Sequence, residues 1–465
     1  MRVNDMPKLL LSFYGDDFTG STDAMEALAF NGIKTVLFLE PPSRELLQNK
    51  FKDVKAIGLA GVSRAMGIKQ MDEELKPLLE ELARIPSHIV HYKMCSTFDS
   101  STTVGSIGHV IDMGMEFVPC TDKQKGYVPL LVGAPVLKRY TLFGHHFATV
   151  GEKTFRLDRH PTMSRHPVTP MDEADLCLHL AKQTNKSIIN MDIHDLSGSP
   201  EQVQKRLASR LEKHADIVLF DVLDDERLKA AGRLIWEGAS EQGNRWVVGS
   251  SGVEYGLVMH WNEKGISDPA NDSLVPVEAV NQILVVSGSC SPVTAGQIRY
   301  ALSNGFKGIA IPAERLIMPG EADKLRRQLV DQTITIIQSG LSPLLYTALG
   351  PEDASIGRIQ SRLLTMGYQA ADSGRLLGEQ LGLLTKEIIE RSGLRRFVIA
   401  GGDTSGFVTR QLGIYALEAV IPVAPGGPLC KGYSVDERFE HIQFVLKGGQ
   451  VGKENFFAEV REAAR

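Results

Sequence analysis

Two adjacent carboxylates, Asp16 and Asp17, are the residues of this chain best placed to do chemistry. They follow an apolar run at 9–14 that is typical of a buried β-strand, and residues 19–22 then begin a helical pattern. Open α/β sheets bind ligands at the carboxyl ends of their strands, where such a turn lies. Because neighbouring like charges repel each other, we predict a functional pair. The alternative interpretation is that one of the two only caps the helix.

Positively charged side chains follow two other predicted strands. Arg64 comes just after the apolar run at 56–61, and Lys93 closes the run at 88–93, with Ser96 shortly beyond it. Parallel strands end at the same edge of a sheet, so we expect these groups to lie near the aspartate pair. A bidentate arginine and a lysine are the usual partners of a small carboxylate ligand, and a serine hydroxyl suits a sugar. The alternative for either cation is a surface ion pair.

Glycine-rich turns in the C-terminal part of the chain are candidate phosphate sites. At 397–413 a strand-like run reaches Gly401 and Gly402, and a helical pattern begins near Thr404. Glycines at a helix start leave backbone N–H groups open to a phosphate oxygen. The neighbouring Asp403 carboxylate and the Thr404 hydroxyl suit a metal ion bound to that phosphate.

A second turn of this kind lies at 283–298, where Ser287 and Ser289 precede a helical pattern, and further glycine-rich turns lie at 424–428 and 446–452. Each turn alone is common in purely structural positions, whereas four in one region favour a nucleotide. The chain has no Walker-type P-loop motif and no Rossmann glycine fingerprint after a strand.

The cysteines and histidines form no standard metal-site pattern. The five cysteines are scattered, contain no CxxC pair and support neither a disulfide framework nor a zinc site. Cys95 has no identifiable base partner, so we interpret it as a small packing residue rather than a nucleophile. Residues 136–172 are basic and rich in histidine, and we predict an irregular loop there, in which Arg165 and His166 are candidates for substrate contact.

Short apolar runs alternate with helical patterns along the whole chain, which predicts an α/β fold with largely parallel sheets. A length of 465 residues indicates more than one domain, and the polar, proline-containing stretch at 263–281 is the clearest linker. We therefore expect one α/β domain at 1–262 and a second at 282–465.

The charge and hydropathy patterns narrow the classes of partner. A net charge of −5 gives no reason to expect nucleic acid or an anionic membrane. The chain shows neither a secretory apolar region nor an apolar run of membrane-spanning length, so we expect a cytoplasmic protein that acts on small molecules.

Six segments in register resemble the four-carbon acid sugar kinase family and together cover nearly the whole chain. They are GDDFTGSTD at 15–23, SR at 63–64, KMCSTFDS at 93–100, RHPVTPM at 165–171, SGSCS at 287–291 and GGDTSG at 401–406. The resemblance implies an N-terminal domain that binds a sugar acid and a C-terminal domain that binds ATP, both α/β, with the active site in the cleft between them.

Position by position, the resemblance also implies roles for individual residues. The sugar acid falls to Asp17 (with Asp16 as the alternative), Arg64, and the segment Lys93–Ser96, which includes Cys95. The resemblance assigns the nucleotide to Ser289, Gly401, Gly402, Asp403, Thr404, Gly448 and Gly449, and Ser287 of the same serine-rich turn is a further candidate. The segment at 95–100 is similar to the 3-oxo-tetronate kinase branch, whereas the threonate kinase branch carries an aspartate where Cys95 stands.

The predicted activity is therefore ATP-dependent phosphorylation of the terminal primary hydroxyl of 3-oxo-tetronate, with Mg²⁺ on the ATP phosphates. We expect Asp17 to accept the proton of that hydroxyl, with Asp16 in reserve. Alternative substrates are 3-oxo-isoapionate, threonate and erythronate. More distant alternatives are a metal-dependent sugar-acid aldolase or dehydratase and a nucleotide-gated binding protein. The metal ligands and the oligomeric state, including a homodimer, are left open.

Overall fold

A computed structural model describes residues 8–118, 126–166, 168–212, 214–239, 244–267, 277–369 and 372–464. The chain forms two compact units, Met1–Ser273 and Leu274–Arg465. Cys120 and residues 268–276 of the predicted linker lie outside the described residues.

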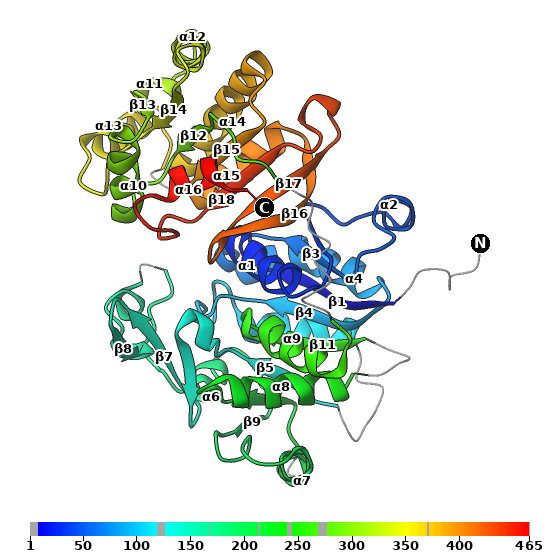
Figure 1. The fold of residues 1–465 in the computed structure, drawn as a ribbon. Helices are drawn as coiled ribbons and strands as arrows, with labels where there is room; N and C mark the ends of the chain where they lie inside the picture. Colours follow the sequence, from blue (N-terminus) through cyan, green and yellow to red (C-terminus); the bar gives the residue numbers. More distant parts are fainter. Residues whose placement is uncertain are drawn as a thin grey trace. The chain divides into compact units, whose positions relative to one another are not determined.

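The first unit contains parallel strands in the order β2-β3-β1-β4-β11-β5-β10-β9 (Figure 1). Most of their side chains are buried, as expected for parallel strands that are covered on both faces. The strands are β1 (Leu9–Gly15), β2 (Thr35–Phe38), β3 (Ala56–Ala60), β4 (Ser87–Lys93), β5 (Val128–Leu131), β9 (Ile188–Met191), β10 (Ile217–Phe220) and β11 (Arg245–Gly249).

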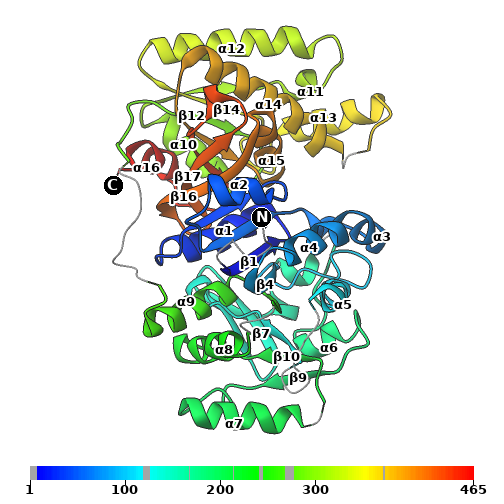
Figure 2. The same cartoon turned by 90° about the vertical axis from the view of Figure 1, so that its right-hand side faces the viewer.

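Helices cover both faces of these strands (Figure 2). One face carries α1 (Phe18–Ala29), α8 (Asp225–Glu237) and α9 (Gly252–Lys264), and the other carries α4 (Lys76–Ala83) and α5 (Ile107–Phe117). The packing is close, because Trp246 of β11 occupies the space that a side chain at Gly114 of α5 would need. The remaining helices are α2 (Arg44–Asn49), α3 (Ile68–Gln70), α6 (Leu176–Leu180) and α7 (Pro200–Leu211).

Strand β1 is the switch point of this unit. It pairs with β3 on one side and with β4 on the other, and all three strands run parallel. The turns after these strands therefore leave the same edge, the position at which open α/β sheets bind ligands. Asp16, Arg64 and Lys93 are brought together in this way.

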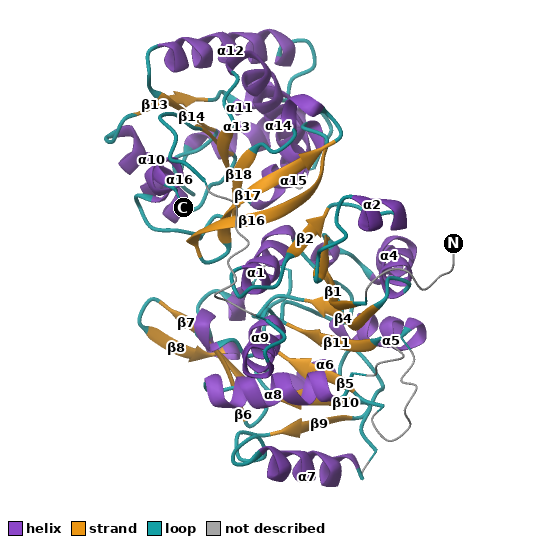
Figure 3. Ribbon diagram, turned by 45° about the vertical axis from the view of Figure 1, so that its right-hand side comes forward, coloured by secondary structure: helices purple, strands orange, loops and turns teal. Residues whose placement is uncertain are grey.

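The segment at 136–172 corrects one prediction. Where the sequence predicts an irregular loop, the structure has a three-stranded antiparallel sheet of β6 (Arg139–Leu142), β7 (His145–Val150) and β8 (Lys153–Arg156) (Figure 3). Asp221, which follows β10, fixes the β6–β7 turn by accepting the backbone N–H groups of Phe143 and Gly144. A carboxylate that is remote in the sequence thus accepts the backbone N–H groups of this turn, whose own sequence has no recognisable hairpin signal.

The second unit contains strands in the order β13-β14-β12-β15-β18-β17-β16. The first five in this order are parallel, and β17 runs antiparallel to both of its neighbours. Strand β17 was missed in the sequence, where residues 424–428 were interpreted only as a glycine-rich turn. The strands are β12 (Leu284–Ser287), β13 (Phe306–Ala310), β14 (Ser342–Tyr346), β15 (Arg396–Ala400), β16 (Ile414–Ala424), β17 (Gly427–Ser434) and β18 (Gln443–Lys447).

Helices again lie on both faces of these strands. On one face α12 (Ala322–Gln338), α14 (Ser373–Ser392) and α15 (Gly402–Gln411) pack together, and on the other α10 (Pro292–Leu302) packs with α16 (Phe456–Glu462) (Figure 2). The short α11 (Ala313–Leu316) and α13 (Ala354–Thr365) complete the unit. The predicted α/β class with largely parallel strands is confirmed.

Candidate functional site

Asp16 is a buried carboxylate held by an arginine. It is 2% exposed, and its two oxygens accept from Arg64 at 2.8 Å from Nη2 and 3.1 Å from Nε. The backbone N–H of Cys95 donates to the same carboxylate at 3.3 Å. Burial raises the pKa of Asp16, and Arg64 opposes this rise. The side chain is therefore fixed by its partners and has little access to a ligand.

Asp17 is the more accessible carboxylate of the pair, with 31% of its side chain exposed. Its Oδ1 accepts the N–H of Gly20 at 2.7 Å and so caps α1, while its Oδ2 lies 2.9 Å from Nη1 of Arg64. The capping interpretation thus holds for Asp17, but the cap and the arginine also fix the direction of a partly exposed carboxylate. That is the arrangement a general base requires.

Arg64 holds both aspartates. A guanidinium has five N–H groups, and contacts to Asp16 and Asp17 use one on each nitrogen, which leaves one on Nη1 and one on Nη2. Burial would lower the pKa of Arg64, but Asp16, Cys95 and Asp17 raise it. The sequence did not show that this cation is already paired with the two carboxylates.

Lys93 lies beneath the turn after β1. It is 3% exposed, and its Nζ is 4.0 Å from Oδ2 of Asp23, a residue of α1 that the sequence did not single out. Burial would lower the pKa of Lys93, whereas Asp23, Asp17 and Asp16 raise it. A side chain at Gly20 would occupy the position of this ammonium group, so glycine is needed there.

Cys95 and Ser96 form the loop after β4. Burial raises the pKa of the Cys95 thiol to about 11, although Arg64 opposes it, so the side chain stays a thiol at neutral pH. The carbonyl of Ser96 lies 2.8 Å from Nε2 of His146 in β7. Burial lowers the pKa of His146 to about 4, so this ring is neutral and donates from Nε2 to the carbonyl. The small antiparallel sheet thereby fixes the loop.

Two predicted substrate residues show no recorded link to this cluster. Arg165 is an exposed residue at the end of a short 3₁₀ segment, Met163–Arg165. Nδ1 of His166 lies 3.1 Å from the N–H and 3.0 Å from the hydroxyl of Thr169. Within the part of the chain that is described, no hydrogen bond or ion pair joins either side chain to Asp16, Asp17 or Lys93, and their substrate role stays a prediction.

Arg139, the first residue of β6, was missed by sequence reasoning. Its Nη1 donates to the carbonyls of Leu137 at 2.9 Å and Lys138 at 3.2 Å, while its buried Nε has no hydrogen-bond partner among the described residues. Burial lowers the pKa of Arg139, and the anionic forms of Cys95 and Asp99 act in the opposite direction. A further cation therefore lies in the electrostatic range of the Cys95 loop.

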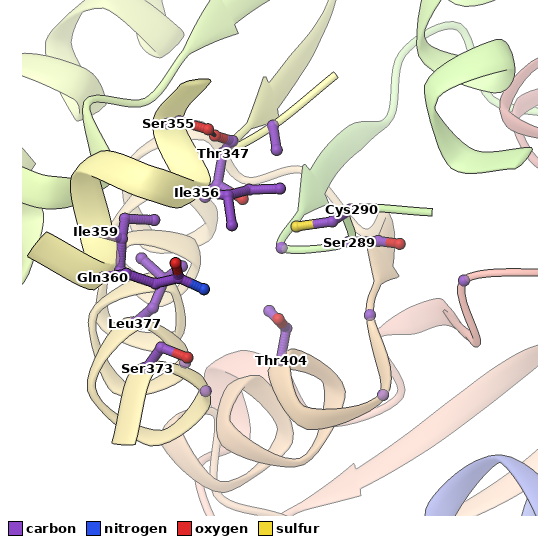
Figure 4. A pocket seen from close by; sticks show the side chains of 17 residues that line it. Ser289, Cys290, Thr347, Ser355, Ile356, Ile359, Gln360, Ser373, Leu377 and Thr404 are labelled. Carbon is purple, nitrogen blue, oxygen red and sulfur yellow. Dashed lines mark hydrogen bonds between the residues drawn. The ribbon is translucent and has the colours of Figure 1, made fainter. Parts of the chain in front are cut away.

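The second unit contains a pocket of about 330 Å³ at the carboxyl ends of its parallel strands (Figure 4). Its floor consists of predicted phosphate-site residues: Gly288, Ser289, Gly401, Gly402, Thr404 and Gly449. Gly401 has a φ of 126°, a conformation that only glycine adopts without strain. The turns that follow β12, β15 and β18 meet at this floor, although they are distant in the sequence.

Other predicted nucleotide residues have different positions. Ser287 is fully buried, and its hydroxyl accepts the N–H of Ser289 at 3.4 Å, so it shapes the turn. Gly448 precedes Gly449 but is not among the residues that line the pocket. The side chain of Asp403 lies outside the described part of the structure. The turn at 424–428 forms the β16–β17 hairpin and does not line the pocket.

The opposite side of the pocket is apolar and comes from helices α13 and α14. Ile356, Ile359 and Leu377 lie there, and the Gln360 amide and Ser373 hydroxyl lie beside them (Figure 4). An apolar wall with a few polar groups facing a glycine-rich floor is the pattern of a nucleotide site. Sequence reasoning missed this wall because helices of this composition are common in any core.

Both halves of the chain match known domain families. Residues 11–257 match a sugar-binding N-terminal domain, and residues 284–457 match a nucleotide-binding C-terminal domain. A 3-oxo-isoapionate kinase from Paraburkholderia graminis is 43% identical over 98% of this chain and 94% of its own length. The chain belongs to the four-carbon acid sugar kinase family.

Membership confirms the resemblance, and the protein is an acid-sugar kinase. A 3-oxo-tetronate kinase from Pectobacterium atrosepticum is 28% identical over 97% of this chain and 98% of its own length. Among solved structures, a Salmonella typhimurium protein has a TM-score of 0.78 at 23% identity and covers 98% of this chain and 99% of its own. A Haemophilus influenzae protein has a TM-score of 0.74, also at 23% identity, over 97% of this chain and 99% of its own. These two structures share the fold.

Membrane-spanning helices are absent from the described residues. None of their helices combines the length and the apolar composition that crossing a bilayer requires.

Proposed function

We propose that this acid-sugar kinase transfers the terminal phosphoryl group of ATP to a primary hydroxyl of a small 3-oxo sugar acid. The branched 3-oxo-isoapionate is our first candidate, because the 43% identical relative is named for it. The sequence segment at 95–100 led us to predict 3-oxo-tetronate, which becomes the second candidate, supported by relatives at 28% identity. Threonate and erythronate are the remaining alternatives.

The single observation that carries the sugar-acid site is the fixed Asp17 carboxylate beside the buried Lys93 and the partly buried Arg64. Asp17 is held by Gly20 and Arg64 yet stays 31% exposed, so we assign it the proton of the attacking hydroxyl. Asp16 is the reserve, but its burial and its bidentate pairing with Arg64 make it a positioning residue. Lys93 and the remaining N–H groups of Arg64 are our candidates for the substrate carboxylate.

The nucleotide lies, in this proposal, in the pocket of the second unit. Its phosphates contact the turns at Ser289, Gly401–Thr404 and Gly449, and its base lies against the wall of α13 and α14. Phosphoryl transfer demands positioning and charge neutralisation more than covalent chemistry, which these backbone turns can supply. The predicted cleft between the two domains stays a prediction.

Mg²⁺ fits the donor set of this pocket. Among the described residues no group of three or more His, Cys, Asp or Glu side chains could hold a metal ion. Kinase Mg²⁺ is bound mainly by phosphate oxygens, water and one or two protein oxygens, for which the hydroxyls of Thr404 and Ser289 are suited. When bound, the ion neutralises charge on the phosphates.

The test is release of ADP from MgATP in a coupled assay with the four candidate acids. We expect the highest kcat/KM with 3-oxo-isoapionate and a phosphorylated product in equal amount. A higher value with 3-oxo-tetronate would reverse the order of the two candidates. Nucleotide binding without ADP release for any of the acids would favour a binding protein, and conversion of an acid without ATP would favour an aldolase or dehydratase.

A further inference from the structure

Lys447 is a buried lysine that the function described so far does not use. It is the last residue of β18, directly before Gly448 and Gly449, and it is 0% exposed. Its Nζ donates to Oγ1 of Thr294 at 2.9 Å. Among the residues that the structure describes, no carboxylate forms an ion pair with it. The chain therefore places a cation inside this unit without a described counter-charge.

The surroundings of this ammonium group belong to the phosphate side of the pocket. Thr294 is in the first turn of α10, and its hydroxyl donates to the carbonyl of Gly449 at 3.0 Å. Gly449 lines the pocket, and its Cα lies against Ser289 and Ser291, because a Cβ there would come within 3.1 Å of the Ser289 Oγ. A hydrogen-bonded chain thus runs from Lys447 through Thr294 to the pocket floor.

The charges that Lys447 and the start of α10 contribute are both positive. The N-terminus of α10 has a partial positive charge, and Lys447 adds a full one beside it. Burying an ammonium group without an anion costs free energy of desolvation. This burial lowers the pKa of Lys447 to about 8. A bound phosphate would supply the missing negative charge, whereas an apolar ligand would not.

No charged side chain among the described residues contributes to the pKa shift of Lys447. Burial is the sole cause of its lowered pKa, and the ring of Phe456 from α16 lies 6.0 Å from its Nζ. The titratable groups on the elements that pack around it are Arg299 and Tyr300 on α10, Arg396 on β15, Cys430, Lys431 and Tyr433 on β17, Glu459, Arg461 and Glu462 on α16, Lys453 and Glu454 in the preceding loop, and Arg410 and Asp403 on α15, of which the Asp403 side chain lies outside the described part of the structure.

We propose that Lys447 is a positioning residue for the nucleotide phosphates, which supplies the buried positive charge that a phosphate bound at Ser289 and Gly449 requires. It acts through Thr294 and Gly449 rather than by touching the ligand. The inference rests on the proposed nucleotide site and adds the residue that makes this site selective for phosphorylated nucleosides. Its chemistry is that of a buried cation and a phosphate anion in a site of low dielectric constant.

The experiment compares the wild type with Lys447→Met by isothermal titration with MgADP, MgATP and adenosine at pH 7. We expect the variant to bind both nucleotides about 10- to 100-fold more weakly, because their phosphates lose the attraction of a nearby buried positive charge in a site of low dielectric constant. Adenosine, which has no phosphate, should bind equally to both proteins. Because methionine removes a buried charge, calorimetry of the ligand-free variant should show an unchanged or higher Tm.

A pH series gives a second readout. The wild type should lose MgADP affinity as the pH rises from 7 to 9, since Lys447 loses its proton around pH 8, and the variant should lose less. Lys431→Met is the matched control, because Lys431 is paired with Glu418 at 3.5 Å and does not line the pocket. We expect this control to bind MgADP as the wild type does.

Three outcomes would overturn the inference: equal MgADP affinity of wild type and Lys447→Met, an equal loss for adenosine, or a lower Tm of the ligand-free variant. The last would show that Lys447 only supports the fold. If the wild type itself binds neither nucleotide, the proposed function fails. That result differs from one in which the wild type binds MgADP and Lys447→Met binds it equally well.

Discussion

At the scale of single residues, the two neighbouring aspartates have different environments although the sequence presents them as equals. Asp16 is 2% exposed and pairs with Arg64 through both oxygens, whereas Asp17 is partly exposed and caps α1. Burial therefore makes one a fixed anchor for Arg64 and leaves the other able to meet a substrate. We therefore assign the proposed acid–base role to Asp17 because of its exposure and not because of the motif.

Asp17→Asn should lower kcat by about 10²- to 10⁴-fold, the usual contribution of a general base. Asparagine caps helices as well as aspartate does, so α1 should stay intact and MgADP affinity should not change. The measurement is kcat in the ADP-release assay together with titration of MgADP. Asp224→Asn is the matched control, since Asp224 caps α8 and pairs with Arg227 at 3.0 Å in the same way. Near-normal turnover of Asp17→Asn would remove Asp17 from this role.

His146 predicts a pH dependence for the stability of the first unit. Burial lowers its pKa from 6.5 to about 4, so the unfolded chain binds more protons than the folded one between these values. The contribution of the neutral His146 to the free energy of unfolding is fully present above pH 6.5. It is lost as the pH falls towards 4, by up to about 3 kcal/mol.

The measurement for His146 is urea unfolding followed by tryptophan fluorescence at several pH values. All three tryptophans, Trp236, Trp246 and Trp261, belong to the first unit, so their signal reports on it. His146→Gln keeps a donor for the Ser96 carbonyl and should reduce the loss of stability between pH 6.5 and 4. An equal pH dependence in the two proteins would contradict the neutral, buried histidine.

At the scale of elements, turns with unusual backbone conformations hold the site. Gly401 lies between β15 and α15 with a φ of 126°, and a Cβ there would lie 3.5 Å from the backbone of the Gly288–Ser289 turn. Alanine there has to adopt a rarely populated conformation or move the turn. The start of α15 is thus set by one backbone angle that glycine alone tolerates.

Gly401→Ala should therefore destabilise the second unit by about 1–3 kcal/mol and weaken MgADP binding. Gly406→Ala is the control in the same helix, because an added Cβ there meets no atom within 4 Å and alanine favours helix by about 1 kcal/mol. Calorimetry and MgADP titration of both variants measure the two effects. Equal behaviour of the two alanines would contradict the strained turn.

At the scale of the whole molecule, we propose one ligand site in each of the two units, and each ligand should then protect its own set of backbone amides. MgADP should slow hydrogen exchange at 287–290, 401–405 and 448–449, which form the pocket floor and its flanks. The sugar acid should slow exchange at 15–20, 63–65 and 93–97. Mass spectrometry of each binary complex measures this. Protection of the first set by the sugar acid alone would contradict the assignment.

The sequence by itself determined much of this protein: most of the parallel strands of both units, the α/β class, the family, and the turns at Asp16, Gly401 and Ser289. These signals are local, since hydrophobic periodicity and glycine-rich turns depend on neighbours in the chain.

Only the tertiary structure decided which side chains meet. Asp16 pairs with an arginine 48 positions away, Lys447 reaches Thr294 across 153 positions, and the β6–β7 turn depends on Asp221, 77 positions from Gly144. Such pairings arise from strand order and burial, which also set the charge state of Lys93 and His146, and no local pattern encodes them.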